Sequence, residues 1–166
     1  MHLAHSTETP SLSVQLVQTM KLDFAIMDSF LAHTKRNIER GAPTKAPYEC
    51  LASQDYSRLT LPIANHLSGK LTENEIVTAL NFYSSSTGKK YTEYGLVGAH
   101  KDFGIGANES YPTFSDQDEL VFDSFLKTGA AGKLIKESVL TSPELGRLIR
   151  PIINEMISEC KSGNKP

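Results

Sequence analysis

The chain has 166 residues and a formal net charge of −2; 39% of its residues are hydrophobic and 22% are charged. One domain is expected at this length, with roughly 70% of the unfolded surface buried on folding. The charge gives no general attraction to nucleic acid or anionic lipid, and no apolar run approaches the ~18 residues that a membrane-spanning helix needs.

The first long apolar pattern predicts a helix near the N-terminus. Residues 1–10 carry no periodic pattern and are predicted to be disordered. From Leu12 the apolar residues recur every three or four positions, which indicates a single helix reaching about Arg40, with Gly41 as its stop.

A second helical pattern covers Asp55 to Leu67. Pro62 lies inside it and should either kink the helix or start a new one. His66 falls on the apolar face without a second metal-binding residue beside it, so we interpret it as a core or rim histidine. Gly69 is expected to end the element.

The most informative stretch begins at Leu71. Thr72 is a favoured N-cap residue, and Glu75 follows at the spacing of a capping box. The helix that they start should end within Ser84 to Gly88, where helix propensity is low. A weaker helix should follow from about Lys89 to Lys101.

A looser copy of this unit follows at Phe114 to Ile135. Ser115 and Asp118 repeat the cap spacing, and Phe125 lies ten residues after its cap, as Phe82 does in the first unit. The pattern indicates that a helix–break–helix unit is duplicated, on the evidence of one imperfect pair.

The end of the chain predicts a short helix over Ala130 to Leu140 and a longer one from Pro143. The longer helix has the cleanest apolar stripe in the chain, which includes Leu145, Leu148 and Met156, and Pro151 should kink it without ending it. Residues 162–166 are expected to be a flexible polar tail. Because no alternating β-branched run is present, the fold is predicted to be all-α, a single compact bundle of about six to seven helices over residues 11–161.

The two cysteines bear on the compartment. If Cys50 and Cys160 are bridged, they close a loop of about a hundred residues, which the chain-entropy model values at up to roughly 4–5 kcal/mol. The alternative is two unpaired buried thiols, as in many cytosolic proteins. We favour the bridge. Because the N-terminus lacks a signal-peptide pattern, an exported location would require that a signal was removed.

Two short motifs resemble those of serine β-lactamases and penicillin-binding proteins. Ser86-Thr-Gly-Lys89 spells S-x-x-K, and Lys127-Thr-Gly129 spells K-T-G. The chain is too short for that fold, and K-T-G falls at a helix end instead of on a strand. We interpret both as chance matches, and keep an envelope enzyme that uses Ser86 and Lys89 as an alternative.

No cofactor or metal is predicted. Gly88-Lys89 and Gly132-Lys133 lack the earlier glycine and the following Ser or Thr of a phosphate-binding loop. The five histidines are scattered and form no close cluster with the cysteines, so a dedicated metal site is not expected.

The longest irregular stretch, Asp102 to Thr113, supplies candidate contact residues. It mixes glycines with aromatic and apolar side chains, and is either packed over the bundle or exposed as a contact loop. The candidate partner-binding residues on it are Phe103, Ile105, Asn108, Glu109 and Tyr111.

The central unit resembles a bacterial domain-of-unknown-function family, number 2059. The similar residues are Leu61-Pro62, Leu71-Thr-Glu-Asn-Glu75-Ile76 and Phe82-Tyr-Ser-Ser-Ser-Thr-Gly-Lys-Lys90, and the resemblance spans roughly residues 55–135. The chain departs from the family at Ser86, where proline is usual. The resemblance implies a small helical protein exported to the periplasm, and it supplies no catalytic residues.

Together these patterns predict a non-enzymatic periplasmic binding protein. An immunity-type inhibitor that blocks a secreted antibacterial effector is the form we consider first, with a protein and not a nucleic acid as its partner. The alternatives are the envelope enzyme described above and a carrier that holds a small apolar ligand between helices.

Overall fold

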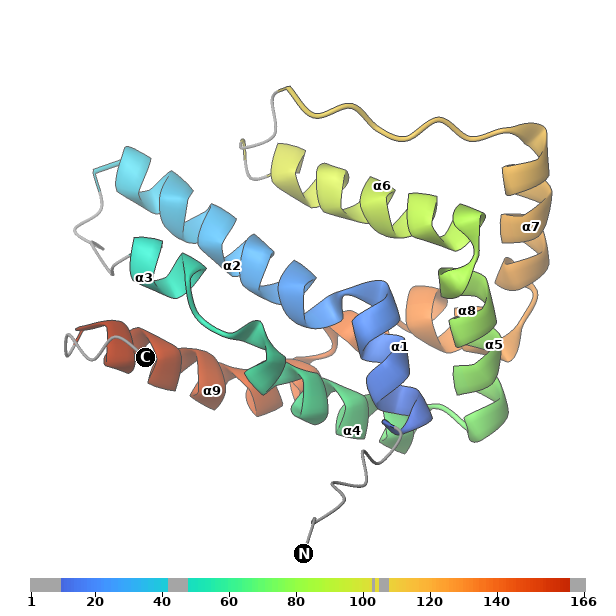
Figure 1. The fold of residues 1–166 in the computed structure, drawn as a ribbon, viewed down its shortest axis with the longest axis horizontal. Helices are drawn as coiled ribbons and strands as arrows, with labels where there is room; N and C mark the ends of the chain where they lie inside the picture. Colours follow the sequence, from blue (N-terminus) through green and yellow to red (C-terminus); the bar gives the residue numbers. More distant parts are fainter. Residues whose placement is uncertain (1–9, 42–47, 103, 105–107, 162–166) are drawn as a thin grey trace, which may run out of the picture.

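Helices make up the regular structure in the part of the chain that the computed structural model describes, which is residues 10–41, 48–102, 104 and 108–161 (Figure 1). These ranges contain no strand, so the all-α prediction is confirmed, although they hold nine α-helices instead of six or seven. The α-helices are α1 (Leu12–Met20), α2 (Leu22–Glu39), α3 (Tyr48–Ala52), α4 (Thr60–Lys70), α5 (Glu73–Ser84), α6 (Ser86–Asp102), α7 (Asp116–Leu126), α8 (Gly129–Ala131) and α9 (Pro143–Lys161). The shorter helical turns are η1 (Tyr56–Leu59), η2 (Gly132–Lys136) and η3 (Val139–Thr141).

The helix expected to run unbroken from Leu12 to Arg40 is divided at Lys21, and that prediction is wrong. Lys21 adopts the left-handed conformation, with φ of 51°, and its N–H donates to the Gln18 carbonyl oxygen at 3.2 Å. The corner lets α1 pack on α4 and α5 while α2 turns toward α3 and α6. Gly41, with φ of +80°, follows the end of α2 as expected.

The helix predicted over Ala130 to Leu140 is also wrong. It consists of α8, the π-helical turn η2 and the 3-10 turn η3, and Ser138 between the last two has a left-handed φ of 54°. Pro62 lies in the first turn of α4, so it belongs to a new helix and does not kink an old one. Pro151 lies inside α9, which continues past it. The tail at 162–166 and all but Pro10 of the predicted disordered N-terminus lie outside the described residues.

Both predicted capping boxes are present. The Thr72 hydroxyl oxygen accepts from the Glu75 N–H at 3.3 Å, and a Glu75 carboxylate oxygen accepts from the Thr72 N–H at 2.7 Å. Ser115 and Asp118 form the same reciprocal pair at the start of α7. Corresponding positions in the two units lie 43 residues apart (72 to 115).

The two units are joined by ion pairs that cross from one to the other. Lys133 of the second unit donates to Glu75 of the first at 2.7 Å, and Lys90 of the first donates to Asp118 of the second at 2.6 Å. Each lysine lies fifteen residues after the capping acid of its own unit (75 to 90, 118 to 133). Thr87 also donates to Asp118, at 2.7 Å. The hydrogen bond from Lys90, followed by that from the Ser115 N–H, holds the pKa of Asp118 well below its usual range.

A pair of phenylalanines at equivalent positions lies between the units. The rings of Phe82 and Phe125 stack with centroids 4.0 Å apart and planes 2° apart, and both side chains are buried. The hydroxyls of Ser85 and Thr128, again equivalent, each donate to the phenylalanine carbonyl three residues earlier, at 2.6 and 2.7 Å. The two units therefore share matched local geometry at their caps and at the residues that follow the phenylalanines.

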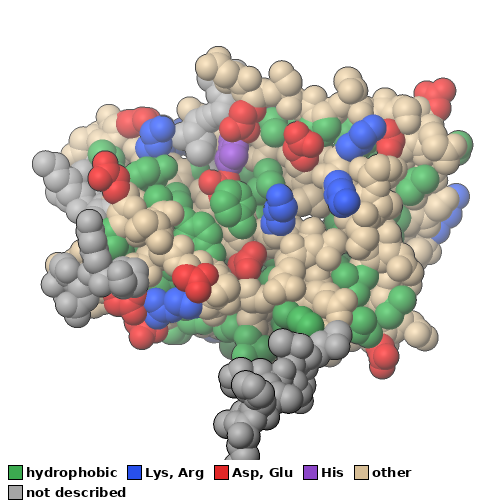
Figure 2. Space-filling model, in the orientation of Figure 1, with side chains coloured by type: hydrophobic (Ala, Val, Ile, Leu, Met, Phe, Trp, Pro, Cys, Tyr) green, Lys and Arg blue, Asp and Glu red, His purple; other side chains and the backbone are tan. Residues whose placement is uncertain are grey.

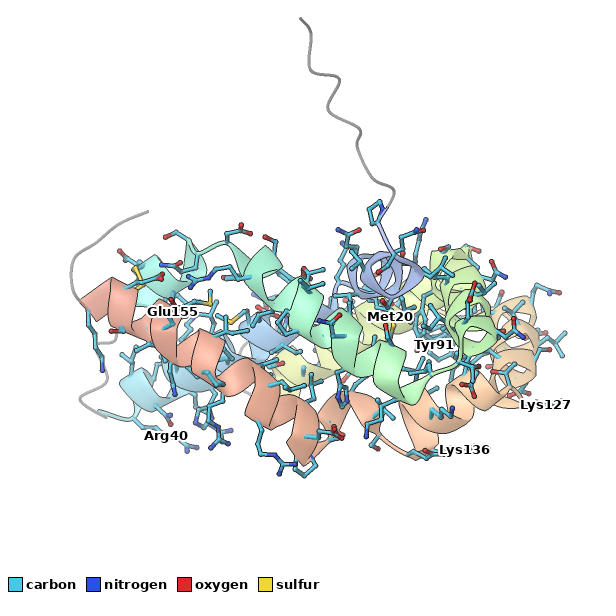
Figure 3. The ribbon with its side chains drawn as sticks, turned by 90° about the horizontal axis from the view of Figure 1, so that it is seen from below. Met20, Arg40, Tyr91, Lys127, Lys136 and Glu155 are labelled. Carbon is cyan, nitrogen blue, oxygen red and sulfur yellow. A yellow bond between two sulfur atoms is a disulfide. The ribbon has the colours of Figure 1, made fainter. Side chains whose placement is uncertain are left out.

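The bridge predicted between Cys50 and Cys160 is present, with an S–S distance of 2.00 Å and a Cα–Cα distance of 5.8 Å (Figure 3). It fastens the end of α9 to α3. The fully buried core lies mainly beneath α1, α2, α4 and α9 and includes Leu16, Met27, Leu59, Ile63, Leu67, Leu145 and Met156. Leu148 of the predicted α9 stripe is instead 48% exposed. No helix within the described ranges is long and apolar enough to cross a membrane.

Candidate functional site

The extended segment 108–115 runs along α6 and leads into α7 (Figure 1). Two of the candidate partner-binding residues, Phe103 and Ile105, lie outside the described residues. The candidates that lie on the segment, all of them exposed, are Asn108, Glu109 and Tyr111. The segment therefore combines the two alternatives, packing on the bundle and exposure to solvent.

Aromatic side chains from α6, the segment and α7 form a continuous row, termed here the aromatic strip, which comprises Tyr91, Tyr94, Tyr111, Phe114 and Phe122. The Tyr91 and Phe122 rings stack with centroids 3.7 Å apart, and Phe114 lies 4.5 Å from Tyr91. The Tyr94 and Tyr111 rings lie 4.7 Å apart. Because each such pair contributes about 0.5–1.5 kcal/mol beyond its buried area, the strip holds the segment against α6.

One end of the aromatic strip faces solvent. Tyr94 is 47% exposed and Tyr111 is 43% exposed, so two rings in tilted contact present their outer surfaces to water. The Lys101 ammonium nitrogen lies 5.4 Å from the centroid of the Tyr111 ring. Two tyrosines held by ring-to-ring contact offer a large contact area at little further cost in side-chain entropy.

Acidic side chains accompany the strip. The chain between Lys101 and Lys127 contains six Asp and Glu residues and no Lys or Arg. Burial, and then the carboxylates of Glu119 and Asp123, raise the pKa of Tyr91, which shows that α7 presents negative charge toward the strip. Negative charge therefore gathers at the Tyr91 and α7 end of the strip, whereas Lys101 lies beside Tyr111 at the exposed end.

His100 connects three elements at the other end of the segment. Its Nδ1 lies 2.8 and 2.7 Å from the two carboxylate oxygens of Glu109, and its Nε2 contacts the Asp28 carboxylate on α2. The His100 and Asp28 side chains are 19% and 21% exposed, against 41% for Glu109. The histidine thus joins α6, α2 and the segment through polar contacts.

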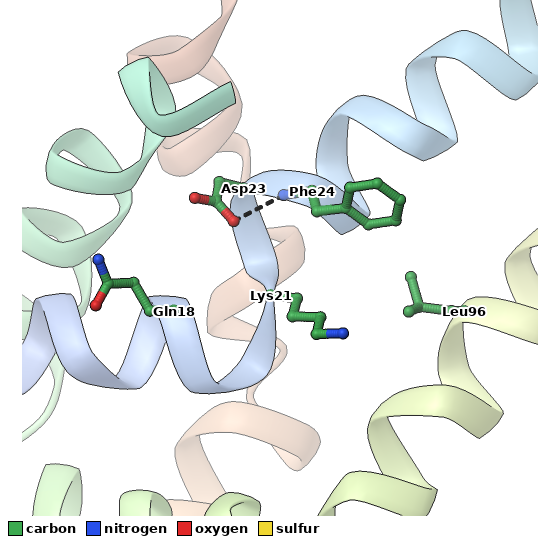
Figure 4. Close-up of a pocket in the computed structure, with 5 residues that line it drawn as sticks. All are labelled: Gln18, Lys21, Asp23, Phe24 and Leu96. Atoms are coloured by element: carbon green, nitrogen blue, oxygen red, sulfur yellow. Dashed lines mark hydrogen bonds between the residues drawn. The ribbon is translucent and has the colours of Figure 1, made fainter. Parts of the chain in front are cut away.

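A shallow hollow lies between the α1–α2 corner and α6. Figure 4 shows Lys21 and Phe24 on one side of it and Leu96 on the other, and its volume is about 410 Å³. A second hollow of about 360 Å³ shares Lys21 and Leu96 and extends to Lys89. Figure 2 shows hydrophobic side chains on this face between charged groups of both signs. The face is therefore uneven and partly apolar next to the aromatic strip.

The serine–lysine alternative gains no support from the geometry. Ser86 and Lys89 are both exposed in the first turn of α6, and no hydrogen bond joins them among the described residues. The K-T-G motif lies at the end of α7, as expected for a chance match. His66 is 5% exposed and its Nε2 lies 3.2 Å from the Val139 carbonyl oxygen, in agreement with a core histidine. Within the described ranges no group of three or more His, Cys, Asp or Glu side chains could hold a metal ion.

Comparison with known proteins identified no relative: no family model, no curated protein and no solved structure matches the chain.

Sequence reasoning named Glu109 and Tyr111 but missed the surface on which they lie. The spacing of Tyr91 and Tyr94 on a glycine-containing helix was the available signal, since it places two aromatic rings on one side of α6. No signal pointed to His100, because its partner Asp28 lies 72 residues away in sequence.

Proposed function

We propose that the protein is a non-enzymatic periplasmic binding protein, and that it acts as an immunity-type inhibitor of a secreted antibacterial effector. The single observation that carries the proposal is the exposed end of the aromatic strip, where the rings of Tyr94 and Tyr111 lie 4.7 Å apart and both side chains are nearly half exposed. Aromatic rings that are fixed before binding are typical anchors of protein interfaces. The family resemblance and the Cys50–Cys160 bridge support the choice of an oxidising, extracytoplasmic compartment.

The chemistry of the surface indicates the kind of partner. Two half-exposed tyrosines fit an apolar pocket, and the carboxylates of Glu119 and Asp123, which lie toward Tyr91 at the other end of the strip, fit basic side chains on one side of that pocket. We therefore expect a partner with a Lys- or Arg-rimmed cleft, as an enzyme that acts on an anionic substrate would have. Binding should weaken with added salt, mainly through a slower association rate.

The test is direct binding to the purified products of genes that neighbour its own, measured by calorimetry at micromolar concentration. The Tyr94→Ala/Tyr111→Ala variant should bind at least about tenfold more weakly than the natural chain, because it removes both anchors. Leu61→Ala is the matched control, since Leu61 is 60% exposed but lies on α4. An unchanged affinity in the double variant, or no partner among these products, would contradict the proposal.

The inhibitor assignment has its own readout. Cells that export the identified partner should lose viability, and co-export of the natural chain should restore it. Co-export of the double tyrosine variant should restore viability less well. Loss of protection in the Leu61→Ala control would show that the effect is not specific to the strip.

A further inference from the structure

The contacts of His100 place an ionisable group at the junction of the proposed binding surface. Glu109 lies two residues before Tyr111 on segment 108–115, and its carboxylate meets Nδ1 at 2.7 and 2.8 Å. Asp28, on α2, meets Nε2. One imidazole ring therefore lies between two carboxylates that belong to different elements.

This arrangement depends on protonation. A neutral imidazole has one N–H group and one lone pair, so it can donate to only one carboxylate. The doubly protonated ring donates from both nitrogens and carries a positive charge that both carboxylates stabilise. The geometry described here is therefore that of the imidazolium form.

The charged groups around the ring favour that form. Burial on its own would lower the pKa of His100, but the hydrogen bonds and charges of Asp28 and Glu109 outweigh it, and the pKa is raised above the ordinary value of 6.5. On α2, Arg36 points to the main chain, with Nη1 3.5 Å from the Asp102 carbonyl oxygen. On α6 the neighbouring charges are those of Lys101 and Asp102.

Beyond Asp28 lies Tyr56 of η1. Burial, and then the Asp28 carboxylate, raise the pKa of this tyrosine, so it stays neutral over the pH range in which a histidine titrates. No group of η1 therefore changes its charge over the pH range in which His100 titrates. The protonation of the ring is set mainly by Asp28 and Glu109.

We propose that His100 is a pH-sensitive latch that holds segment 108–115, and with it Tyr111, in the binding conformation when the ring is protonated. The latch regulates the surface assigned under the proposed function and rests on that proposal for its biological role. When the ring loses a proton, one carboxylate loses its donor. The Glu109 contact opens, because Glu109 is the more exposed partner and can turn toward water, whereas Asp28 is fixed on α2.

The direction of the effect follows from the raised pKa. The latch is fully closed below the ordinary histidine pKa of about 6.5, and it opens as the pH rises through the higher value in the folded protein. We expect the segment to be roughly threefold to tenfold less protected on the alkaline side, since the contact is partly exposed and other ring contacts remain. Tyr111 should then leave Tyr94 more often.

The experiment measures the free protein by backbone NMR, following amide signals and their mobility from Asn108 to Phe114 between about pH 5.5 and pH 9. In the natural chain the segment should become mobile with a single midpoint above the ordinary histidine value. His100→Gln should leave it mobile at every pH. His100→Arg, which carries a permanent charge, should keep it ordered at every pH.

Controls separate the latch from a purely structural role. Glu109→Gln should lower the pH midpoint of the His100 transition and mobilise the segment at low pH. Glu93→Gln, which changes an exposed carboxylate on α6, the helix of His100, should alter neither the midpoint nor the mobility of the segment. A segment equally ordered at pH 6 and pH 9 in the natural chain would overturn the latch and leave the binding proposal intact. If the segment titrates as described but the affinity of the partner does not depend on Tyr94 and Tyr111, the binding role is overturned instead.

Discussion

At the scale of the residue, Gly88 has the least room for a side chain among the described glycines. A Cβ at this position would lie 2.1 Å from the Phe82 carbonyl oxygen and 2.6 Å from the Tyr83 Cα. Both are backbone atoms, which cannot move aside without disturbing α5. The glycine therefore allows α6 to start directly against the last turn of α5.

Replacement of Gly88 by alanine should lower the free energy of unfolding by about 3 kcal/mol or more, because the added methyl group overlaps the backbone. Urea unfolding followed by circular dichroism measures the change. Gly95→Ala on the same helix is the matched control: nothing lies within 4 Å of its Cβ position, so alanine should stabilise the protein by about 0.5–1 kcal/mol. Equal effects of the two substitutions would show that the close approach is not what determines the cost.

At the scale of the element, the two units are tied to one another. The capping acid of each unit, besides completing its own capping box, is paired with the lysine of the other. The hydrogen bond from Lys133, followed by that from the Thr72 N–H, lowers the pKa of Glu75, as the corresponding contacts do for Asp118. The same local motif thus serves both as a helix cap and as a connection between units.

A double-mutant cycle can isolate the connection from the cap. Glu75→Gln retains the hydrogen bonds of a capping box but removes the charge, and Lys133→Met removes its partner. Because both side chains are partly exposed, we expect a coupling free energy of roughly 0.5–1 kcal/mol, measured by urea unfolding and reduced by added salt. A coupling of zero at low salt would mean that the crossed pairs are incidental.

The sequence was most informative where structure depends on neighbouring residues. The spacing of Thr72 and Glu75, and of Ser115 and Asp118, predicted both capping boxes correctly because such caps form within four residues. The division at Lys21 could not be predicted in this way. A lysine does not favour the left-handed conformation, and its adoption there reflects how α1 packs on distant helices.

The candidate site was predictable only in part for the same reason. Aromatic residues in an irregular stretch indicated contact residues, and Tyr111 is indeed exposed. The ring contact of Tyr111 with Tyr94 and the contact of His100 with Asp28 join residues that are distant in sequence. Such contacts are set by the path of the whole chain, which one sequence does not show.

At the scale of the whole molecule, the Cys50–Cys160 bridge spans 110 residues and closes the chain from α3 to the end of α9, with α1 and α2 outside the loop. Its removal by Cys50→Ala/Cys160→Ala should lower the free energy of unfolding by about 2–4 kcal/mol, mainly because the unfolded chain becomes less restricted. Thermal unfolding with and without reductant provides the internal control, since reductant should destabilise the natural chain and leave the variant unchanged. Equal stability of the oxidised chain and the variant would contradict this expectation.

The wide separation of these connections has a consequence for how the protein is made. The ribosome synthesises the chain from its N-terminus, so 58 further residues are added after Glu75 before its partner Lys133 is complete. In the same way, 110 residues are added after Cys50 before Cys160 is complete. Until then α4 and α5 carry apolar surface that α9 and α8 later cover, and the nascent chain is a natural client for holding chaperones. Removal of the last helix alone would therefore leave the bundle incomplete and Cys50 without its partner. The free thiol of Cys50 would then be able to form a disulfide with another protein.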